Sequence, residues 1–268
     1  MEAKARAERS SLVACVAART RSGTRKAANE DAIGFAGAVS VMASGSLIEL
    51  EANIDGGIVC LLADGAGGHP GGDHASRIVV EYILAQADNR LRSSEELGRA
   101  ISSAHLELRR VMATNQQWDG MGSTVAVLSL SVGGAVIGNV GDSSIFEIDS
   151  QGLVTLSVAD NPPRPPWMPA GRPITGLTQM LGGPDAAAQV EPHLGRFPLE
   201  AGMRLLMCSD GLTDALGEDE IDSIIRRGFG RDTPLVDALI ESATAQGATD
   251  DISVVLVRLD EGSGATVT

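Results

Sequence analysis

The alternation of apolar and polar positions predicts most of the elements in the first half of the chain. Apolar runs of strand length lie at 12–18, 32–41 and 58–63. Apolar residues that recur every three to four positions predict helices over 73–91 and 94–115, with Ser94 as the cap of the second helix. Residues 43–57 contain Gly and Ser at mixed polarity, which is typical of a hairpin or a loop insertion.

The second half of the chain shows the same change between strand and helix periodicity. Strands are predicted at 124–132, 135–140, 144–149, 203–208 and 251–259, and helices at 218–227 and 234–245. The intervening segment 160–173 holds six of the 11 prolines together with Trp167. Because proline removes a backbone donor and fixes φ, this segment is predicted to be an exposed linker or a lid rather than a regular element.

The order of the elements predicts the architecture. Strands come first, then two helices, then strands, then two helices and a final strand. Strands and helices that are segregated in blocks argue against a doubly wound parallel sheet. We therefore expect an α+β fold, in which two antiparallel β-sheets pack together and pairs of helices cover the outer faces.

Composition excludes several classes of partner. The 268 residues are 43% hydrophobic and 21% charged, as in a globular protein. Acidic residues outnumber basic residues by 35 to 21, giving a net charge of −14, which argues against nucleic acid or an anionic membrane as a partner. Three cysteines without a Cys-x-x-Cys pair are typical of reduced core residues, and no apolar stretch reaches membrane-spanning length. We expect a cytoplasmic protein.

Carboxylates at strand ends are the main candidates for chemistry. Asp64 ends the apolar run 58–63 and precedes five glycines within eight residues, among which lies His69. Glycines allow a metal, a phosphate or another backbone to approach closely, because they carry no Cβ. An Asp cap of a glycine-rich turn with a surface His is the alternative interpretation of this stretch alone.

Further strand-end carboxylates favour the functional interpretation. They are Glu30, Asp31, Asp142, Asp210 and Asp250. Each one alone is a turn or cap signal, but together, without a His or Cys cluster, they predict an all-oxygen site for a hard divalent cation such as Mg²⁺ or Mn²⁺. A cation also removes the repulsion between neighbouring buried carboxylates.

With these motifs the chain resembles the metal-dependent serine/threonine protein phosphatases of type 2C, in their bacterial form with a single catalytic domain. The matching motifs are Gly23-x-x-Lys26-x-x-Asn29-Glu30-Asp31, Asp64-Gly-Ala-Gly-Gly-His69, Gly122-Ser-Thr124, Val140-Gly-Asp142-Ser143, Ser209-Asp210-Gly211-Leu-Thr-Asp214 and Asp250-Asp251-Ile252-Ser253. The resemblance implies a four-layer α-β-β-α sandwich over residues 11–260, with a flap region at about 158–185. Residues 1–10 and 261–268 are expected to be flexible ends.

The resemblance also implies roles for single residues. Asp64 bridges two metal ions, and the carbonyl of Gly65 and the Glu30-Asp31 pair serve one of them directly or through water. Asp210 and Asp250 hold the other ion, and Asp142 with Asp210 supports a weaker third. His69 matches the proposed general acid, which protonates the leaving serine or threonine oxygen.

Three positions depart from the family pattern. Lys26 stands where a phosphate-binding Arg is usual, and Arg25 is the phosphate ligand instead if the loop is shifted by one residue. Ser144 replaces an Arg after Gly-Asp-Ser. Asp251 replaces an Asn, and its extra charge is expected to alter metal affinity.

The predicted function is metal-dependent hydrolysis of phosphoserine and phosphothreonine in proteins by a monomer that opposes a serine/threonine kinase. Two Mn²⁺ or Mg²⁺ ions per site are implied. The first alternative is a catalytically weak regulatory pseudophosphatase that binds phosphoproteins. The second is a metal hydrolase that acts on small phosphoesters. The presence of all the main carboxylates and of His69 favours the active enzyme over the pseudophosphatase.

Overall fold

The computed structural model describes residues 11–26, 28–36, 46–66, 71–87, 91–169, 174, 176–184, 189–228 and 231–262. The predicted flexible segment 1–10 and residues 263–268 of the predicted tail lie outside this part of the chain, as does His69.

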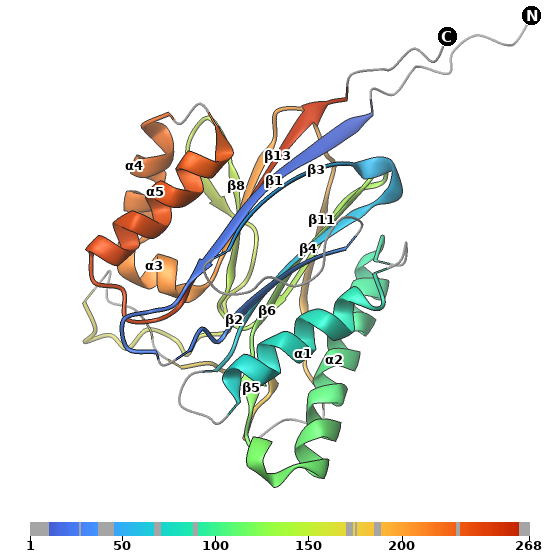
Figure 1. Cartoon of the computed structure of the whole chain (residues 1–268), viewed down its shortest axis with the longest axis vertical. Coiled ribbons are helices and arrows are strands. Elements are labelled where there is room, and N and C mark those ends of the chain that lie inside the picture. Colours follow the sequence, from blue (N-terminus) through green and yellow to red (C-terminus); the bar gives the residue numbers. More distant parts are fainter. Residues whose placement is uncertain are drawn as a thin grey trace, which may run out of the picture.

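Two antiparallel sheets form the centre of the molecule (Figure 1). In spatial order, the six-stranded sheet contains β3 (Leu47–Asn53), β1 (Leu12–Arg21), β13 (Ile252–Glu261), β12 (Arg204–Cys208), β8 (Ser144–Ile148) and β9 (Leu153–Thr155). The five-stranded sheet contains β11 (His193–Phe197), β7 (Gly134–Val140), β6 (Val125–Ser131), β4 (Ile58–Asp64) and β2 (Asp31–Ala36). A short pair, β5 (Gly122–Ser123) and β10 (Leu181–Gly182), lies apart from both sheets in the pairing order.

Helices cover the outer face of each sheet, as Figure 1 shows. The five-stranded sheet carries α1 (Gly72–Leu84) and α2 (Ser94–Thr114). The six-stranded sheet carries α5 (Asp232–Ala245) and α3 (Asp210–Leu216), and α4 (Glu218–Arg226) packs on both of these helices. Single-turn 3₁₀ helices lie at Ile54–Gly56 and Gln116–Trp118.

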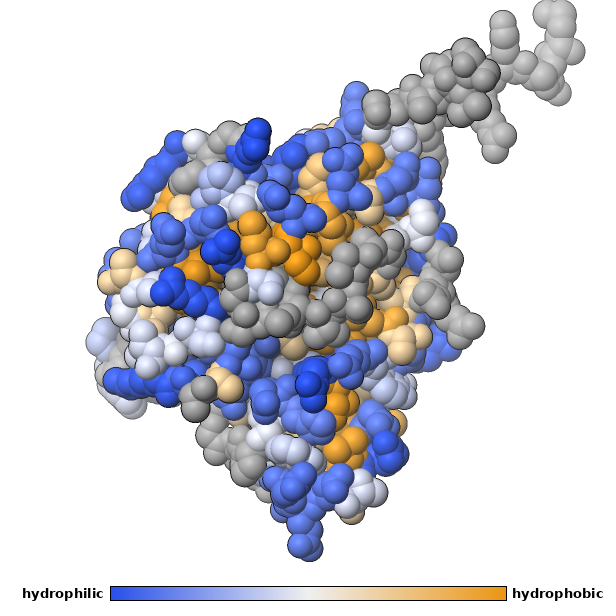
Figure 2. Space-filling view, in the orientation of Figure 1, coloured by the Kyte–Doolittle hydropathy of each residue, from blue (hydrophilic) through white to orange (hydrophobic). Residues whose placement is uncertain are grey.

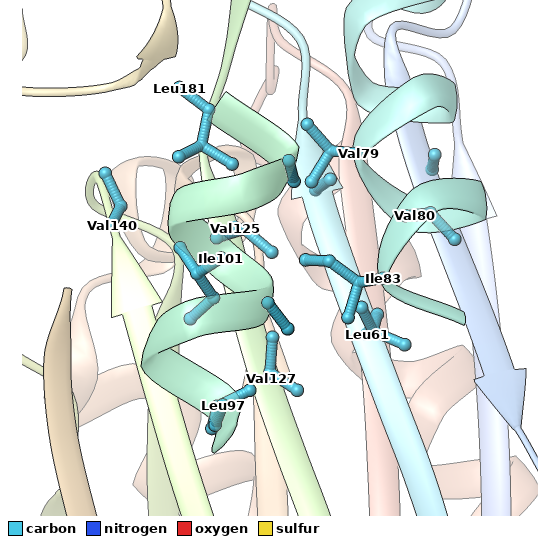
Figure 3. Close-up of a cluster of buried hydrophobic side chains, with 14 of the residues drawn as sticks. Leu61, Val79, Val80, Ile83, Leu97, Ile101, Val125, Val127, Val140 and Leu181 are labelled. Atoms are coloured by element: carbon cyan, nitrogen blue, oxygen red, sulfur yellow. The ribbon is translucent and has the colours of Figure 1, made fainter. Parts of the chain in front are cut away.

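Three separate apolar cores correspond to the three interfaces of a four-layer sandwich. Leu62, Leu128 and Val257 belong to the core between the sheets. Leu61 and Ile101 belong to the core beneath α1 and α2, which Figure 3 shows in close-up. Both sheets therefore bury side chains on both faces, which explains why β4, β6 and β7 are nearly continuous apolar runs. Truncating a fully buried Leu or Ile here to Ala would cost about 2–5 kcal/mol.

The α-β-β-α architecture confirms the predicted fold class. Several details differ from the sequence prediction. Helix α1 ends at Leu84 rather than at residue 91, and the cap of α2 is Ser93 rather than Ser94. The Ser93 hydroxyl accepts a hydrogen bond from the Glu96 backbone, and the Glu96 carboxylate accepts one from the Ser93 backbone, so this capping box fixes the start of the helix.

On the face in Figure 2, hydrophilic residues cover most of the periphery, and apolar patches lie between them. No helix within the described ranges is long and apolar enough to cross a bilayer. Cys60 and Cys208 are buried free thiols, as predicted, whereas Cys15 is only partly buried.

Candidate active site

The pairing of β2 with β4 brings the first two carboxylates together. Asp31 begins β2 and Asp64 ends β4, and the antiparallel register places them directly opposite each other. The Asp64 backbone N–H donates to the Thr124 hydroxyl at 3.0 Å, and the Thr124 N–H donates to the Asp64 carbonyl at 2.8 Å. These two bonds fix the backbone at the end of the strand, so the position of the Asp64 carboxylate is set by the sheet.

The second sheet supplies two more carboxylates at the same end of the sandwich. Asp210 is the first residue of α3 and follows the end of β12, while Asp250 lies just before the start of β13. Strands β12 and β13 are antiparallel neighbours, which explains why the end of one lies beside the start of the other. Asp142 follows β7, and Gly141 makes the connecting turn with φ of 98°.

These side chains share one open cavity of about 760 Å³. Its acidic residues are Asp64, Asp142, Asp210, Asp214 and Asp250. The uncharged part of its wall includes Ile174, Leu177 and Met180 from the predicted flap region. The structure therefore gathers into one cavity four of the aspartates that were predicted to bind metal.

Asp31 is not one of the residues that line this cavity, and it is only 8% exposed. Its Oδ2 accepts hydrogen bonds from the hydroxyls of Ser209 at 2.9 Å and Ser253 at 2.6 Å. Its Oδ1 has no hydrogen-bond partner within the described residues. One oxygen is thus held by the second sheet, and the other is left as a free acceptor.

The electrostatics of the cluster oppose a full set of ionised carboxylates. Burial is the largest cause that raises the pKa of Asp31, Asp64, Asp142 and Asp210, and the negative charges of neighbouring aspartates add to it. Burial and the charges of Asp142 and Asp250 also raise the pKa of Asp214. A bound cation would reverse this balance, because opposite charge favours the ionised form.

The donor set fits divalent cations that prefer oxygen ligands. Asp210 Oδ1, like Asp31 Oδ1, is buried without a hydrogen-bond partner in the described part of the chain. A buried carboxylate oxygen without a donor is costly unless a cation or a proton compensates it. Among the described residues, no group of three or more His, Cys, Asp or Glu side chains is arranged so that it could hold a metal ion as it stands. The cluster therefore provides acceptors and negative charge without a preformed all-protein cage.

Glycines permit the close packing of the segments that carry these carboxylates. A Cβ on Gly65 would collide with the backbone carbonyl of Gly72, and one on Gly211 would collide with that of Asp251. A Cβ on Gly23 would overlap the backbone of Asp250. Each glycine is thus required by a backbone-to-backbone contact beside a candidate ligand.

Lys26 and Arg25 lie in different surroundings. The Lys26 ammonium forms ion pairs with Glu30 and, at 3.0 Å, with Asp250 Oδ1, and its side chain is 17% exposed. Burial opposes its charge, but the hydrogen bonds to Glu30 and Asp250 prevail and raise the pKa of Lys26. Arg25 is exposed. The structure therefore brings Lys26, and not Arg25, against the carboxylate cluster.

The histidines differ in what the structure shows of them. His69, the predicted general acid, lies outside the described residues. His105 is buried, and its Nδ1 accepts the backbone N–H of Gly182 at 3.1 Å. The rings of His74 and Trp118 pack at 4.7 Å between centroids. His193 contacts Asp160 through Nε2 at 2.8 Å. His74, His105 and His193 thus each contact another residue of the described structure.

Two residues next to the site were not predicted from the sequence. The Asn161 amide donates to Asp142 Oδ2 at 2.9 Å and to the Gly176 carbonyl at 3.1 Å, which links Asp142 through Asn161 to a residue just after the proline-rich segment. The buried Asp160 accepts the Gly141 backbone N–H at 2.8 Å. All three hydrogen bonds join positions 15 or more residues apart, so no local periodicity indicates them.

The chain is similar in sequence to known protein phosphatases. The family described as Protein phosphatase 2C matches residues 50–256. Protein phosphatase PhpP of Streptococcus pneumoniae is 30% identical over 226 residues, which cover 78% of this chain and 89% of PhpP. Serine/threonine phosphatase stp of Listeria monocytogenes is 28% identical over 233 residues, covering 78% of this chain and 87% of stp.

Solved structures share the fold. The catalytic domain of the serine/threonine protein phosphatase PstP in complex with two manganese ions has a TM-score of 0.73 at 25% identity, covering 93% of this chain and 99% of that chain. The serine/threonine phosphatase of S. agalactiae has a TM-score of 0.74 at 25% identity, covering 91% and 99%.

Proposed function

This chain belongs to the protein phosphatase 2C family, and from that premise we propose that it removes phosphate from phosphoserine and phosphothreonine in proteins, using two bound Mn²⁺ or Mg²⁺ ions. The observation that carries the proposal is the single cavity that collects aspartates from the ends of both sheets. The unpartnered buried oxygens of Asp31 and Asp210 support it, because they fit a cation better than a neutral ligand.

The candidate ligands divide between two main ions and a weaker third ion. Asp64 and the Gly65 carbonyl, with Glu30 and Asp31, would hold one ion, and Asp210 with Asp250 would hold the other, with Asp64 shared. Asp142 and Asp210 would support a weaker third ion. When bound, such ions supply Lewis-acid activation of a water molecule and neutralise charge that develops on the phosphoryl oxygens.

The other roles belong to side chains of the chain itself. Lys26 would bind the substrate phosphate, because its ammonium lies among the candidate ligands in the described structure. An ammonium is a point charge, so it would hold phosphate less rigidly than the bidentate guanidinium of an Arg. His69 would donate a proton to the serine or threonine oxygen as the ester bond to phosphorus breaks.

The physiological substrate would be a phosphorylated protein, and the opposing enzyme a serine/threonine kinase. We propose a monomer as the active form. A pseudophosphatase is disfavoured because the candidate metal-binding aspartates at positions 64, 142, 210 and 250 all line the cavity.

Neutralising single ligands tests the assignment. Asp64→Asn and Asp210→Asn should each remove nearly all release of phosphate from a phosphothreonine peptide while the circular dichroism spectrum stays that of the wild type. Asp55→Asn is the matched control, because Asp55 is exposed in the 3₁₀ turn Ile54–Gly56 and does not line the cavity. A wild-type kcat for either cavity variant at saturating Mn²⁺ would disprove the ligand assignment.

A further inference from the structure

Asp251 is buried, and backbone donors of a neighbouring loop engage both of its carboxylate oxygens. It is only 1% exposed, and each of its carboxylate oxygens accepts a different backbone N–H. Oδ1 accepts from Gly23 at 2.8 Å, and Oδ2 accepts from Glu30 at 2.7 Å. Gly23 and Glu30 are the two ends of the loop that carries Arg25 and Lys26. We propose that Asp251 is a positioning residue, which closes this loop and thereby holds Lys26 at the substrate phosphate.

The chemistry of the side chain explains why an aspartate suits this position. A carboxylate has two oxygens that only accept, so it can bind two N–H groups at once. The usual residue of the family at this position is asparagine. Its side chain has one accepting oxygen and one NH₂ donor. In this loop its NH₂ would face the N–H of Gly23 or of Glu30, and one of the two bonds would be lost.

Other contacts anchor each half of the loop separately. Its first half is fixed to the segment before Asp251, because Gly23 packs on Asp250 and the Thr24 hydroxyl donates to the Ala248 carbonyl at 3.0 Å. Its second half ends at Glu30, directly before β2, and the Glu30 carbonyl accepts the hydroxyl of Ser76 in α1 at 2.6 Å. Asp251 joins the two halves, and Lys26 lies between them.

The pattern of satisfied oxygens separates this role from a contribution to the metal ligands. Asp31 Oδ1 and Asp210 Oδ1 are left without a partner in the described structure, whereas both oxygens of Asp251 are bonded to backbone. The negative charge of Asp251 thus interacts with two backbone N–H groups of the loop. The functional consequence rests on the proposed role of Lys26 in phosphate binding.

A double-mutant cycle tests the proposal in the full chain loaded with Mn²⁺. Asp251→Asn should raise both KM for a phosphothreonine peptide and Ki for inorganic phosphate by about tenfold, the effect of one lost hydrogen bond to a charged group. The concentration of Mn²⁺ that gives half-maximal activity should change less than about twofold. In the Lys26→Ala background, Asp251→Asn should raise KM no further, because both changes act on one interaction.

Thr24→Val is the matched control, because it removes a side-chain bond of the same loop that does not join its two ends. It should leave Ki for phosphate within about twofold of the wild type. A higher Mn²⁺ requirement with an unchanged KM for Asp251→Asn would overturn the proposal and assign Asp251 to the metal centre. Additive effects of Asp251→Asn and Lys26→Ala would also overturn it.

Amide hydrogen exchange of the wild-type protein tests the loop closure even if Asp251→Asn does not fold. The N–H groups of Gly23 and Glu30 should exchange at least about tenfold more slowly than the N–H of Arg25. The Arg25 N–H donates a longer hydrogen bond, of 3.3 Å, to the Thr249 carbonyl, and Arg25 is exposed. Rapid exchange at Gly23 and Glu30 would refute the closure. If Lys26→Ala alone leaves phosphate binding unchanged, the phosphate role in the proposed function is wrong, while slow exchange would still establish the closure.

Discussion

Asp31→Asn should make the metal-free protein more stable and the enzyme inactive. The pKa of Asp31 is raised from its ordinary 3.8 to about 7, chiefly by burial and further by the charges of Asp251 and Asp250. The folded state therefore holds this proton more tightly than the unfolded state. Stability is lost as pH rises from about 4 to about 7, since Asp31 must then ionise inside the protein.

The size of the effect follows from the shift. Each pKa unit corresponds to about 1.4 kcal/mol, so the roughly three units set an upper limit on the order of 4 kcal/mol at pH 8. The variant avoids this cost, and its side-chain oxygen can still accept the hydrogen bonds of Ser209 and Ser253. Because 1 kcal/mol shifts Tm by about 2–4 °C in a protein of this size, the limit corresponds to a gain of at most about 8–16 °C.

The assay is a thermal melt in EDTA at pH values between 5 and 8. The difference between Asp31→Asn and wild type should be largest at pH 8 and should shrink toward pH 5. Asp55→Asn, the exposed control, should show no such pH dependence. Adding Mn²⁺ should stabilise the wild type more than the variant. A variant that is less stable than the wild type in EDTA at pH 8 would refute the reasoning.

Three further substitutions test the other roles. Lys26→Ala should raise KM by about 10- to 100-fold, which corresponds to the loss of one charge-assisted hydrogen bond, while Arg25→Ala should leave KM unchanged. The reverse result would make Arg25 the phosphate ligand. Asp142→Ala should lower turnover mostly at low Mn²⁺ concentration, and a loss of Tm with unchanged metal dependence would make it a turn residue only. His69→Ala should cost about 10²–10⁴-fold on phosphopeptides and less on nitrophenyl phosphate, whose leaving group is already acidic; equal losses on both would exclude the acid role.

Strong local periodicity accounts for the parts of the fold that the sequence predicted. The fully apolar strands β4, β6 and β7 and the amphipathic helix α2 were found within one or two residues of their observed bounds. Helix α3 was missed, because its seven residues follow a strand directly and are too few to show a helical period. Strand β3 was interpreted as a hairpin or loop insertion, since it is an edge strand whose residues alternate between exposed and partly buried positions.

The site divides in the same way. Its aspartates could be found because each one lies next to an apolar run or a glycine turn along the chain. Their convergence could not be derived from local pattern, because it depends on the register of β2 with β4 and on the packing of two sheets. The contacts of Asp251 and Asn161 join positions far apart in the sequence, so a side chain at either position looks like an ordinary polar loop residue.

Phosphate release by the metal-stripped protein tests the central claim most directly. The full chain is freed of metal, its metal content is measured, and a phosphothreonine peptide is added before and after Mn²⁺. We expect no release above background without metal and a rise to full turnover as Mn²⁺ saturates the aspartate cavity. Full turnover by protein shown to contain no divalent cation would contradict the account.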